Sequence, residues 1–202
     1  MTEEQLSFFQ SLLQDFEKLA DIASEMKWAK TDTNHIKLRI PYSGGITDPS
    51  INITTIGFEK GFVREHFAEA VSQVMIAAVT LIEGLDADKE WQNDELRRDM
   101  LKNYWGISVW DYLEYKDISL TEESMDEMIN YLCENTAYDS ELKKHKNYEL
   151  PTDALAMLSY FHDVKLCNLY SNDEEHVGYG GGNWVALKDD TFLWVRYSGI
   201  TD

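Results

Sequence analysis

Long apolar runs and a basic leader segment are both missing from this sequence. No apolar run approaches the roughly 18 residues that a membrane-spanning helix requires. The first residues, Met1-Thr2-Glu3-Glu4, carry no basic stretch followed by an apolar one, which is the pattern of a signal or transit peptide. We therefore expect a cytoplasmic protein that makes no membrane contact.

Cysteine is also scarce, since Cys133 and Cys167 are the two cysteines of the chain. Neither has a second cysteine near it in sequence, which excludes the C-x-x-C pairs of redox and zinc sites. Two cysteines in 202 residues do not make a disulfide framework either. We expect two buried thiols in a reducing compartment.

The motifs of metal and nucleophilic chemistry are absent as well. Residues 86–90 begin like a calcium-binding EF-hand loop, but Trp91 and Arg97 stand where that loop needs a glycine and a bidentate glutamate. The zinc motif H-E-x-x-H and the serine-nucleophile motif G-x-S-x-G do not occur. The sequence therefore assigns no catalytic residue, no metal ligand and no cofactor.

One weaker constellation leaves open a small enzyme or ligand-binding domain as the alternative function. His162 and Asp163 follow an apolar helix, and His176 comes shortly before a glycine-rich run from Gly178 to Gly182. Histidines beside carboxylates can exchange protons near neutral pH, so this alternative places a pocket among these residues. The structural explanation is a helix C-terminus where His162 meets exposed carbonyl groups, followed by a flexible hairpin loop at the glycines.

Hydrophobic periodicity predicts an α+β fold. Helical spacing of apolar residues covers 2–26, 62–82, 89–104, 109–115, 121–135, 140–145 and 152–162. Strand-like runs cover 35–40, 51–58, 164–170, 183–187 and 191–197. Because the strands lie near both termini, we expect one mostly antiparallel sheet packed on a long central helix at 62–82.

The length of the chain is that of one domain. We expect a single domain over 1–202. It can be subdivided into a helix-strand-strand-helix part (1–84), an acidic helical part (85–163) and a terminal β part (164–202).

Positive charge is the largest deficit of the sequence. The chain has 37 Asp and Glu against 18 Lys and Arg, a formal net charge of −19. Such a charge repels nucleic-acid backbones and anionic lipids, so we expect no direct binding to either. Residues 111–141 hold ten carboxylates and one cation, Lys116. This segment therefore carries nearly half of the net negative charge of the chain. Aromatic residues are interleaved with these carboxylates: Trp110, Tyr112, Tyr115, Tyr131 and Tyr138.

The helix predicted from Thr121 places Glu122 and Glu123 in its first turn, where the helix dipole favours anions. Asp126 and Glu127 then follow them at a spacing of four residues. Like charges at that spacing cost about 0.2–0.5 kcal/mol per pair. A solvated acidic face is the commonest explanation for such a helix, and it is the interleaved aromatic residues that favour a partner-binding surface.

Carboxylates mixed with tryptophan and tyrosine are typical of a surface that captures a basic protein. We therefore predict a binding protein of the kind of toxin-immunity proteins and phage-encoded inhibitors of host defence, rather than an enzyme. The partner would be basic, for example a nuclease or another nucleic-acid-binding protein; the sequence assigns no oligomeric state. The predicted contact residues are Trp110, Asp111, Glu114, Tyr115, Asp126, Glu127, Glu134 and Asp139.

Overall fold

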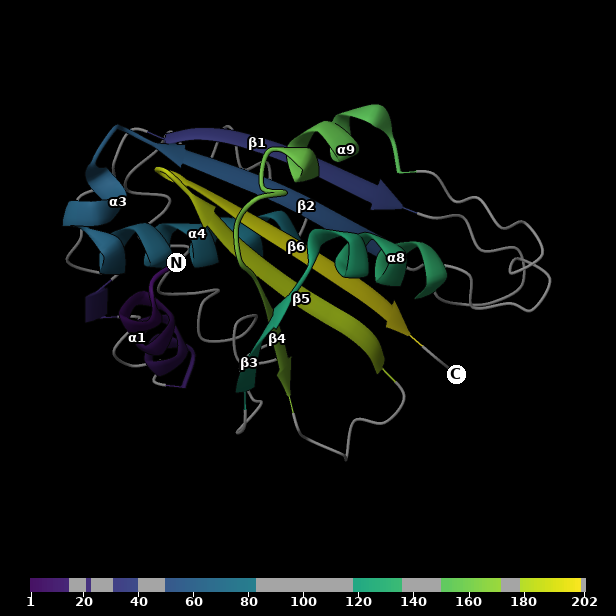
Figure 1. The fold of residues 1–202 in the computed structure, drawn as a ribbon, viewed down its shortest axis with the longest axis horizontal. Coiled ribbons are helices and arrows are strands. Elements are labelled where there is room, and N and C mark those ends of the chain that lie inside the picture. Colours follow the sequence, from purple (N-terminus) through teal and green to yellow (C-terminus); the bar gives the residue numbers. More distant parts are fainter. Residues whose placement is uncertain are drawn as a thin grey trace.

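A computed structural model describes residues 1–14, 21–22, 31–39, 50–82, 118–135, 150–171 and 179–200. Within these ranges the chain forms one sheet with helices on both of its faces (Figure 1). The helices predicted over 89–104, 109–115 and 140–145 lie outside the described residues. No helix in the described ranges has the length and apolarity needed to cross a membrane.

The sheet has six strands in the spatial order β1-β2-β6-β5-β4-β3, and every neighbouring pair is antiparallel. The strands are β1 (Thr31–Arg39), β2 (Ser50–Phe58), β3 (Ile118–Glu123), β4 (Leu166–Ser171), β5 (Tyr179–Lys188) and β6 (Thr191–Ile200). The pairing of β2 with β6 joins two strands that are far apart in sequence. The predicted α+β fold and its single antiparallel sheet are therefore confirmed.

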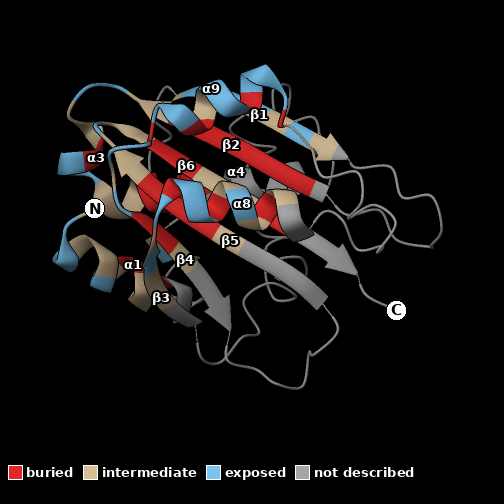
Figure 2. Cartoon of the chain, turned by 45° about the vertical axis from the view of Figure 1, so that its right-hand side comes forward, coloured by how far each residue is buried: buried red, intermediate tan, exposed pale blue. Residues whose placement is uncertain are grey.

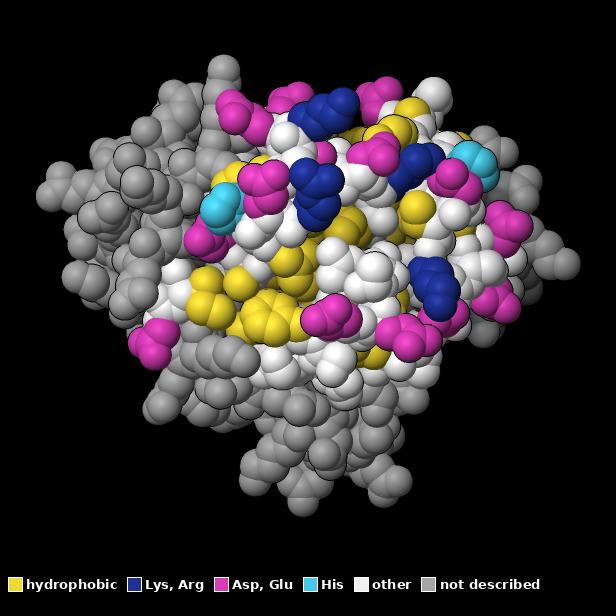
Figure 3. Space-filling model, turned by 60° about the vertical axis from the view of Figure 1, so that its left-hand side comes forward, with side chains coloured by type: hydrophobic (Ala, Val, Ile, Leu, Met, Phe, Trp, Pro, Cys, Tyr) yellow, Lys and Arg dark blue, Asp and Glu magenta, His cyan; other side chains and the backbone are white. Residues whose placement is uncertain are grey.

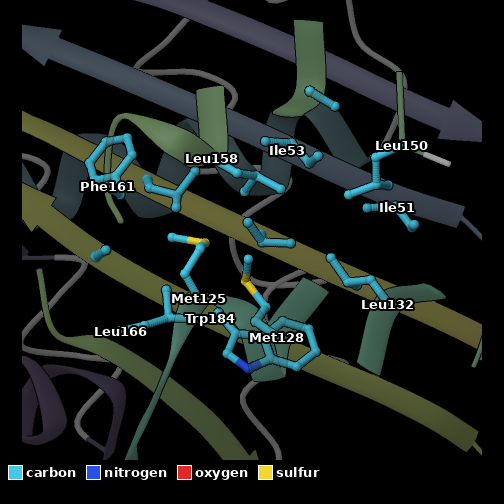
Figure 4. Close-up of a cluster of buried hydrophobic side chains, with 14 of the residues drawn as sticks. Ile51, Ile53, Met125, Met128, Leu132, Leu150, Leu158, Phe161, Leu166 and Trp184 are labelled. Atoms are coloured by element: carbon cyan, nitrogen blue, oxygen red, sulfur yellow. The ribbon is translucent and has the colours of Figure 1, made fainter. Parts of the chain in front are cut away.

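One face of the sheet is covered by α8 (Met125–Asn135) and α9 (Thr152–Ser159), as Figures 1 and 2 show. Side chains from both helices meet alternate residues of β2, β5 and β6 in a buried apolar cluster (Figure 4). Trp184 of β5 lies beneath Met128 of α8, and Leu158 of α9 lies near Ile53 of β2. Burial of each fully buried apolar side chain of this kind adds about 1.5–3 kcal/mol to the stability of the fold.

The opposite face packs on α1 (Glu3–Gln14) and α4 (Phe67–Ile82). Phe9 of α1 contacts the ring of Trp194, and Phe67 of α4 contacts the ring of Phe192. Successive residues of a strand point to opposite faces. Leu193, between these two aromatic residues, accordingly belongs to the α8–α9 side. Because both faces are covered, β2 is buried almost continuously from Ile51 to Ile56.

A single long central helix, predicted at 62–82, is not what the structure shows. The segment divides at His66, whose φ of −133° and ψ of 49° are not helical, into α3 (Phe62–Glu65) and α4. The side chain of His66 stacks on Phe62, with ring centroids 5.0 Å apart, and its Nδ1 lies 3.2 Å from a carboxylate oxygen of Glu69. These contacts hold the histidine at the break.

The start of α3 is fixed by a residue from the other end of the chain. Asp190, in the turn between β5 and β6, accepts hydrogen bonds from the backbone N–H groups of Gly61 (2.8 Å) and Val63 (3.1 Å). Its own carbonyl accepts a bond from the N–H of Phe58 (2.9 Å). Gly61 has a φ of +89°, a conformation that glycine adopts without steric cost. The β5–β6 turn therefore caps α3.

Two element boundaries also differ from the prediction. The helix predicted at 121–135 begins at Met125, because Ile118–Glu123 forms strand β3 beside β4. Of the glycines predicted to form a hairpin loop, Gly180, Gly181 and Gly182 lie inside β5, where Gly180 pairs with Gly199 and Gly182 with Tyr197.

The α8–α9 core gives a direct test of this packing. Leu158 of α9 is fully buried, whereas Leu155 of the same helix is 38% exposed. Leu158→Ala should lower the free energy of unfolding by about 2–5 kcal/mol in urea denaturation, because it removes apolar contacts and leaves a cavity. Leu155→Ala is the matched control and should change it by less than about 0.5 kcal/mol. Equal losses for the two variants would contradict the orientation of α9.

Candidate functional site

The structure brings three of the eight predicted contact residues together on α8. Asp126 and Glu127 lie in its first turn, and Glu134 lies near its end. Asp126 and Glu127 are exposed. The other five predicted residues lie outside the described residues: Trp110, Asp111, Glu114, Tyr115 and Asp139.

Glu127 has a structural role at the start of α8. Its Oε2 accepts a hydrogen bond from the backbone N–H of Ser124 (2.9 Å), and the Oγ of Ser124 accepts one from the N–H of Glu127 (3.1 Å). This reciprocal pair is a capping box, whose sequence signature is a serine followed three residues later by a glutamate. The bonds from Ser124 lower the pKa of Glu127 below its ordinary value. Its charge is therefore explained without a partner protein.

Glu122 and Glu123 belong to β3 and not to a helical turn, which corrects the prediction made for them. Glu123 accepts hydrogen bonds from the indole Nε1 of Trp184 (2.8 Å) and the Nδ2 of Asn168 (2.7 Å). Glu122 receives the ammonium group of Lys165 at 2.6 Å, and this bond raises the pKa of Lys165. Adjacent strand residues face opposite sides of the sheet, so Glu122 and Glu123 make their contacts on opposite faces of it.

Asp126 differs from these three carboxylates. It is exposed in the first turn of α8 and has no hydrogen bond or ion pair to any residue that the structure describes. The helix N-terminus favours its charge but does not neutralise it. Among the described carboxylates of β3 and of the first turn of α8, Asp126 is the one without a described hydrogen bond or ion pair.

Tyr131 is the described member of the interleaved aromatic set. Its ring is partly buried and meets Trp184 edge-on, with centroids 5.1 Å apart, and Tyr197 with centroids 6.0 Å apart. Edge-to-face geometry of this kind is typical of packed aromatic clusters. Tyr131 therefore supports the core beneath α8 rather than the acidic surface.

The enzyme alternative placed a pocket near His162, but His162 and Asp163 make hydrogen bonds at the end of α9. The Nδ1–H of His162 donates to the carbonyl of Ser159 (2.8 Å), which is the helix C-terminal contact expected of it. Asp163 accepts from the Nζ of Lys188 (2.6 Å), and this bond lowers the pKa of Asp163 and raises that of Lys188. Lys188 also donates to the carbonyl of Tyr160 (2.9 Å). These bonds tie the end of α9 to the β5–β6 hairpin.

The remaining parts of that alternative give it no further support. His176 and Gly178 lie outside the described residues, and the glycines from 180 to 182 are strand residues of β5. Within the described part of the chain, no group of three or more His, Cys, Asp or Glu is placed to hold a metal ion.

Comparison with known proteins shows no family for this chain. The sequence matches no protein-family model, and no curated protein matches it. Among solved structures, the crystal structure of citrus MAF1 is similar with a TM-score of 0.30 and 10% sequence identity, over 93% of this chain and 99% of that one. A similarity at this level carries no argument about the present protein.

The capping box predicts a specific dependence on pH. Ser124→Ala should destabilise the protein by about 1 kcal/mol at neutral pH, because the first N–H groups of α8 lose their cap. The lowered pKa of Glu127 means that the part of the stability due to its ionised form is present above the ordinary glutamate pKa of 4.5 and is lost as the pH falls through the lower folded value. The difference between wild type and Ser124→Ala, measured by urea denaturation, should therefore shrink in acid.

The matched control is Asp126→Asn, which changes a neighbouring carboxylate outside the capping box. Its unfolding free energy should stay within about 0.5 kcal/mol of wild type at neutral pH. A loss as large as that of Ser124→Ala would show that the stability of α8 depends on first-turn charge and not on the capping bonds.

Proposed function

We propose that this protein binds a basic protein and inhibits it through the acidic surface that includes the outer side of α8. The observation that carries the proposal is the concentration of charge, with ten carboxylates and one cation between residues 111 and 141. A surface of this charge attracts a basic partner over long range and speeds its encounter.

A nuclease or another nucleic-acid-binding protein fits this surface. Duplex DNA presents one negative charge per about 1.7 Å of its axis. The groove of a protein that binds DNA is therefore lined with cationic side chains. A row of carboxylates seated in that groove would occupy the positions of the phosphates and exclude the nucleic acid. The proposal therefore assigns the protein to the class of toxin-immunity or anti-defence inhibitors.

The described part of the surface supports different roles for neighbouring carboxylates. Asp126, which has no described partner, is available for an intermolecular ion pair. Glu127 is exposed but already accepts a hydrogen bond from the backbone N–H of Ser124. It would therefore attract a basic partner through its charge at longer range rather than by direct contact. The proposal therefore places direct contact at Asp126 ahead of Glu127.

A pull-down from lysate of the source cell at low and high salt tests the proposal. We expect a basic protein to be retained at low salt and released as the salt concentration rises, because ions screen exposed charges over about 10 Å at 0.1 M. Failure to recover any basic protein would overturn the proposed function.

The captured partner then allows a test of α8 itself. Asp126→Asn should weaken binding by up to about fivefold, mainly by slowing association, since an exposed charge pair contributes about 0.2–1 kcal/mol. Stopped-flow association kinetics at several salt concentrations would measure this. An unchanged rate would remove Asp126 from the contact surface.

Glu65→Gln is the control for that measurement. Glu65 is 63% exposed on α3 and lies beside Arg64, so it offers a carboxylate of similar exposure away from α8. The side of the molecule that carries α3 shows acidic and basic side chains interspersed (Figure 3). Glu65→Gln should leave the association rate unchanged.

A further inference from the structure

A row of polar side chains crosses β1, β2, β6 and β5, which lie side by side in the sheet (Figure 1). Lys37 of β1 is opposite Asn52 of β2, and Asn52 is opposite Arg196 of β6. Arg196 is in turn opposite Asn183 of β5. Directly opposed residues point to the same face of a sheet, with Cβ atoms about 4.5–5.5 Å apart. Trp194, two positions before Arg196, contacts α1, so the row lies on the α1–α4 face.

The charge of this row is opposite in sign to that of the whole chain. The chain has 37 Asp and Glu against 18 Lys and Arg, yet the row holds two cations, Lys37 and Arg196, and no carboxylate. The adjacent row on the same face is also free of carboxylates across the same four strands. In it, His35 of β1 is opposite Thr54 of β2, with the His35 Nδ1 3.4 Å from the Thr54 Oγ1. This part of the α1–α4 face is therefore suited to an anion.

Burial increases along the row from the edge of the sheet inward. His35 and Lys37 of the edge strand β1 are exposed, whereas Asn52 is only 6% exposed. The Oδ1 of Asn52 is buried and accepts no hydrogen bond from any residue that the structure describes. An unpaired buried acceptor costs about 1–3 kcal/mol, and native proteins pair the great majority of such groups with protein or with a bound molecule. The row thus begins at accessible side chains and leads to an acceptor that lacks a donor.

The chemistry of these three side chains specifies two groups on a ligand. Lys37 and Arg196 stand on either side of Asn52, about 10 Å apart, because neighbouring strands are about 4.8 Å apart. Long side chains at that separation can meet over a small anion, and two cations match the charge of a dianion. An arginine presents five N–H donors, so Arg196 can hold an anion in addition to its other contacts. A hydroxyl group on the same molecule would supply the donor that the Asn52 Oδ1 lacks.

We propose that Lys37, Asn52 and Arg196 form a binding site for a small phosphate monoester that carries a free hydroxyl group. The phosphate lies between the two cations, and the hydroxyl donates to the Oδ1 of Asn52. The site is on the opposite face of the sheet from α8, so it is separate from the acidic surface of the proposed function and goes beyond it.

Three small probes test the site by nuclear magnetic resonance titration of the isotope-labelled full chain. Glycerol 3-phosphate has both groups, methyl phosphate lacks the hydroxyl, and glycerol lacks the phosphate. Phosphate monoesters are mostly dianions above pH 7, because their second pKa is about 6, and dianionic methyl phosphate has no donor. Glycerol 3-phosphate should shift the side-chain amide signals of Asn52 and the backbone signals of residues 194–196. It should bind roughly tenfold more tightly than methyl phosphate, and glycerol should not bind.

Variants separate the two recognised groups. Asn52→Leu keeps the size of the side chain but removes the acceptor, so it should bind glycerol 3-phosphate and methyl phosphate equally. Because the Oδ1 has no described donor in the ligand-free protein, the same variant should not lower the midpoint of urea unfolding. Lys37→Gln should weaken both phosphates by about two- to fivefold. Lys60→Gln, which changes an exposed lysine just after β2, is the matched control and should weaken neither.

Several results would overturn the inference. These are equal binding of the two phosphates by wild type, binding that leaves the Asn52 signals unshifted, and no binding of glycerol 3-phosphate. A lower unfolding midpoint for Asn52→Leu would show that the amide is needed for the fold and would also count against a ligand role. If that variant does not fold, Lys37→Gln decides, since an unchanged affinity for glycerol 3-phosphate removes the charge contact. None of these measurements involves α8, so the proposed function is tested separately.

Discussion

The pairing of β2 with β6 is the interaction on which the rest of the structure depends. It joins residues 50–57 to residues 191–198, and both strands lie inside the sheet with a neighbour on each side. β1 attaches to the outer side of β2, and β5, β4 and β3 follow in turn from β6. The apolar cluster beneath α8 and α9 needs Ile53 from one strand and Val195 from the other, which are register partners. Neither helix has a complete surface to cover until this pair is formed.

Much of the fold could be predicted from the spacing of apolar residues, because strand and helix periods differ. Five of the six strands and the central parts of α8 and α9 follow from that spacing. Strand β3 could not, since its six residues end in two glutamates that resemble the first turn of a helix. The serine–glutamate spacing at Ser124 and Glu127 was the local signal that α8 starts later. The glycines of β5 were misleading because the two-residue turn at Asp189 and Asp190, several residues further along, sets their register with β6.

The contacts that each carboxylate of the acidic region makes could not be predicted from the sequence. The sequence identifies an acidic region, yet the partners that occupy Glu122 and Glu123 lie more than forty positions away at Lys165, Asn168 and Trp184. Asp126 differs from them because it has no hydrogen bond or ion pair to any described residue, which the sequence does not reveal. The exposure of Leu155 and Tyr160 could not be predicted for a similar reason. The helical pattern marks Leu155 as apolar, and only the packing of α9 turns it outward.

The cap that Asp190 supplies to α3 bears on the order in which the chain can assemble during synthesis. The two hydrogen-bonded positions, Gly61 and Asp190, are 129 residues apart, so the ribosome releases α3 long before its cap exists. β2 waits equally long for β6. Synthesis delivers the N-terminal part first, and contacts between distant residues form slowly. Until the β5–β6 hairpin has emerged, a nascent chain therefore holds α3 without its cap and β2 without its partner β6, and the apolar residues of β2 stay uncovered on that side.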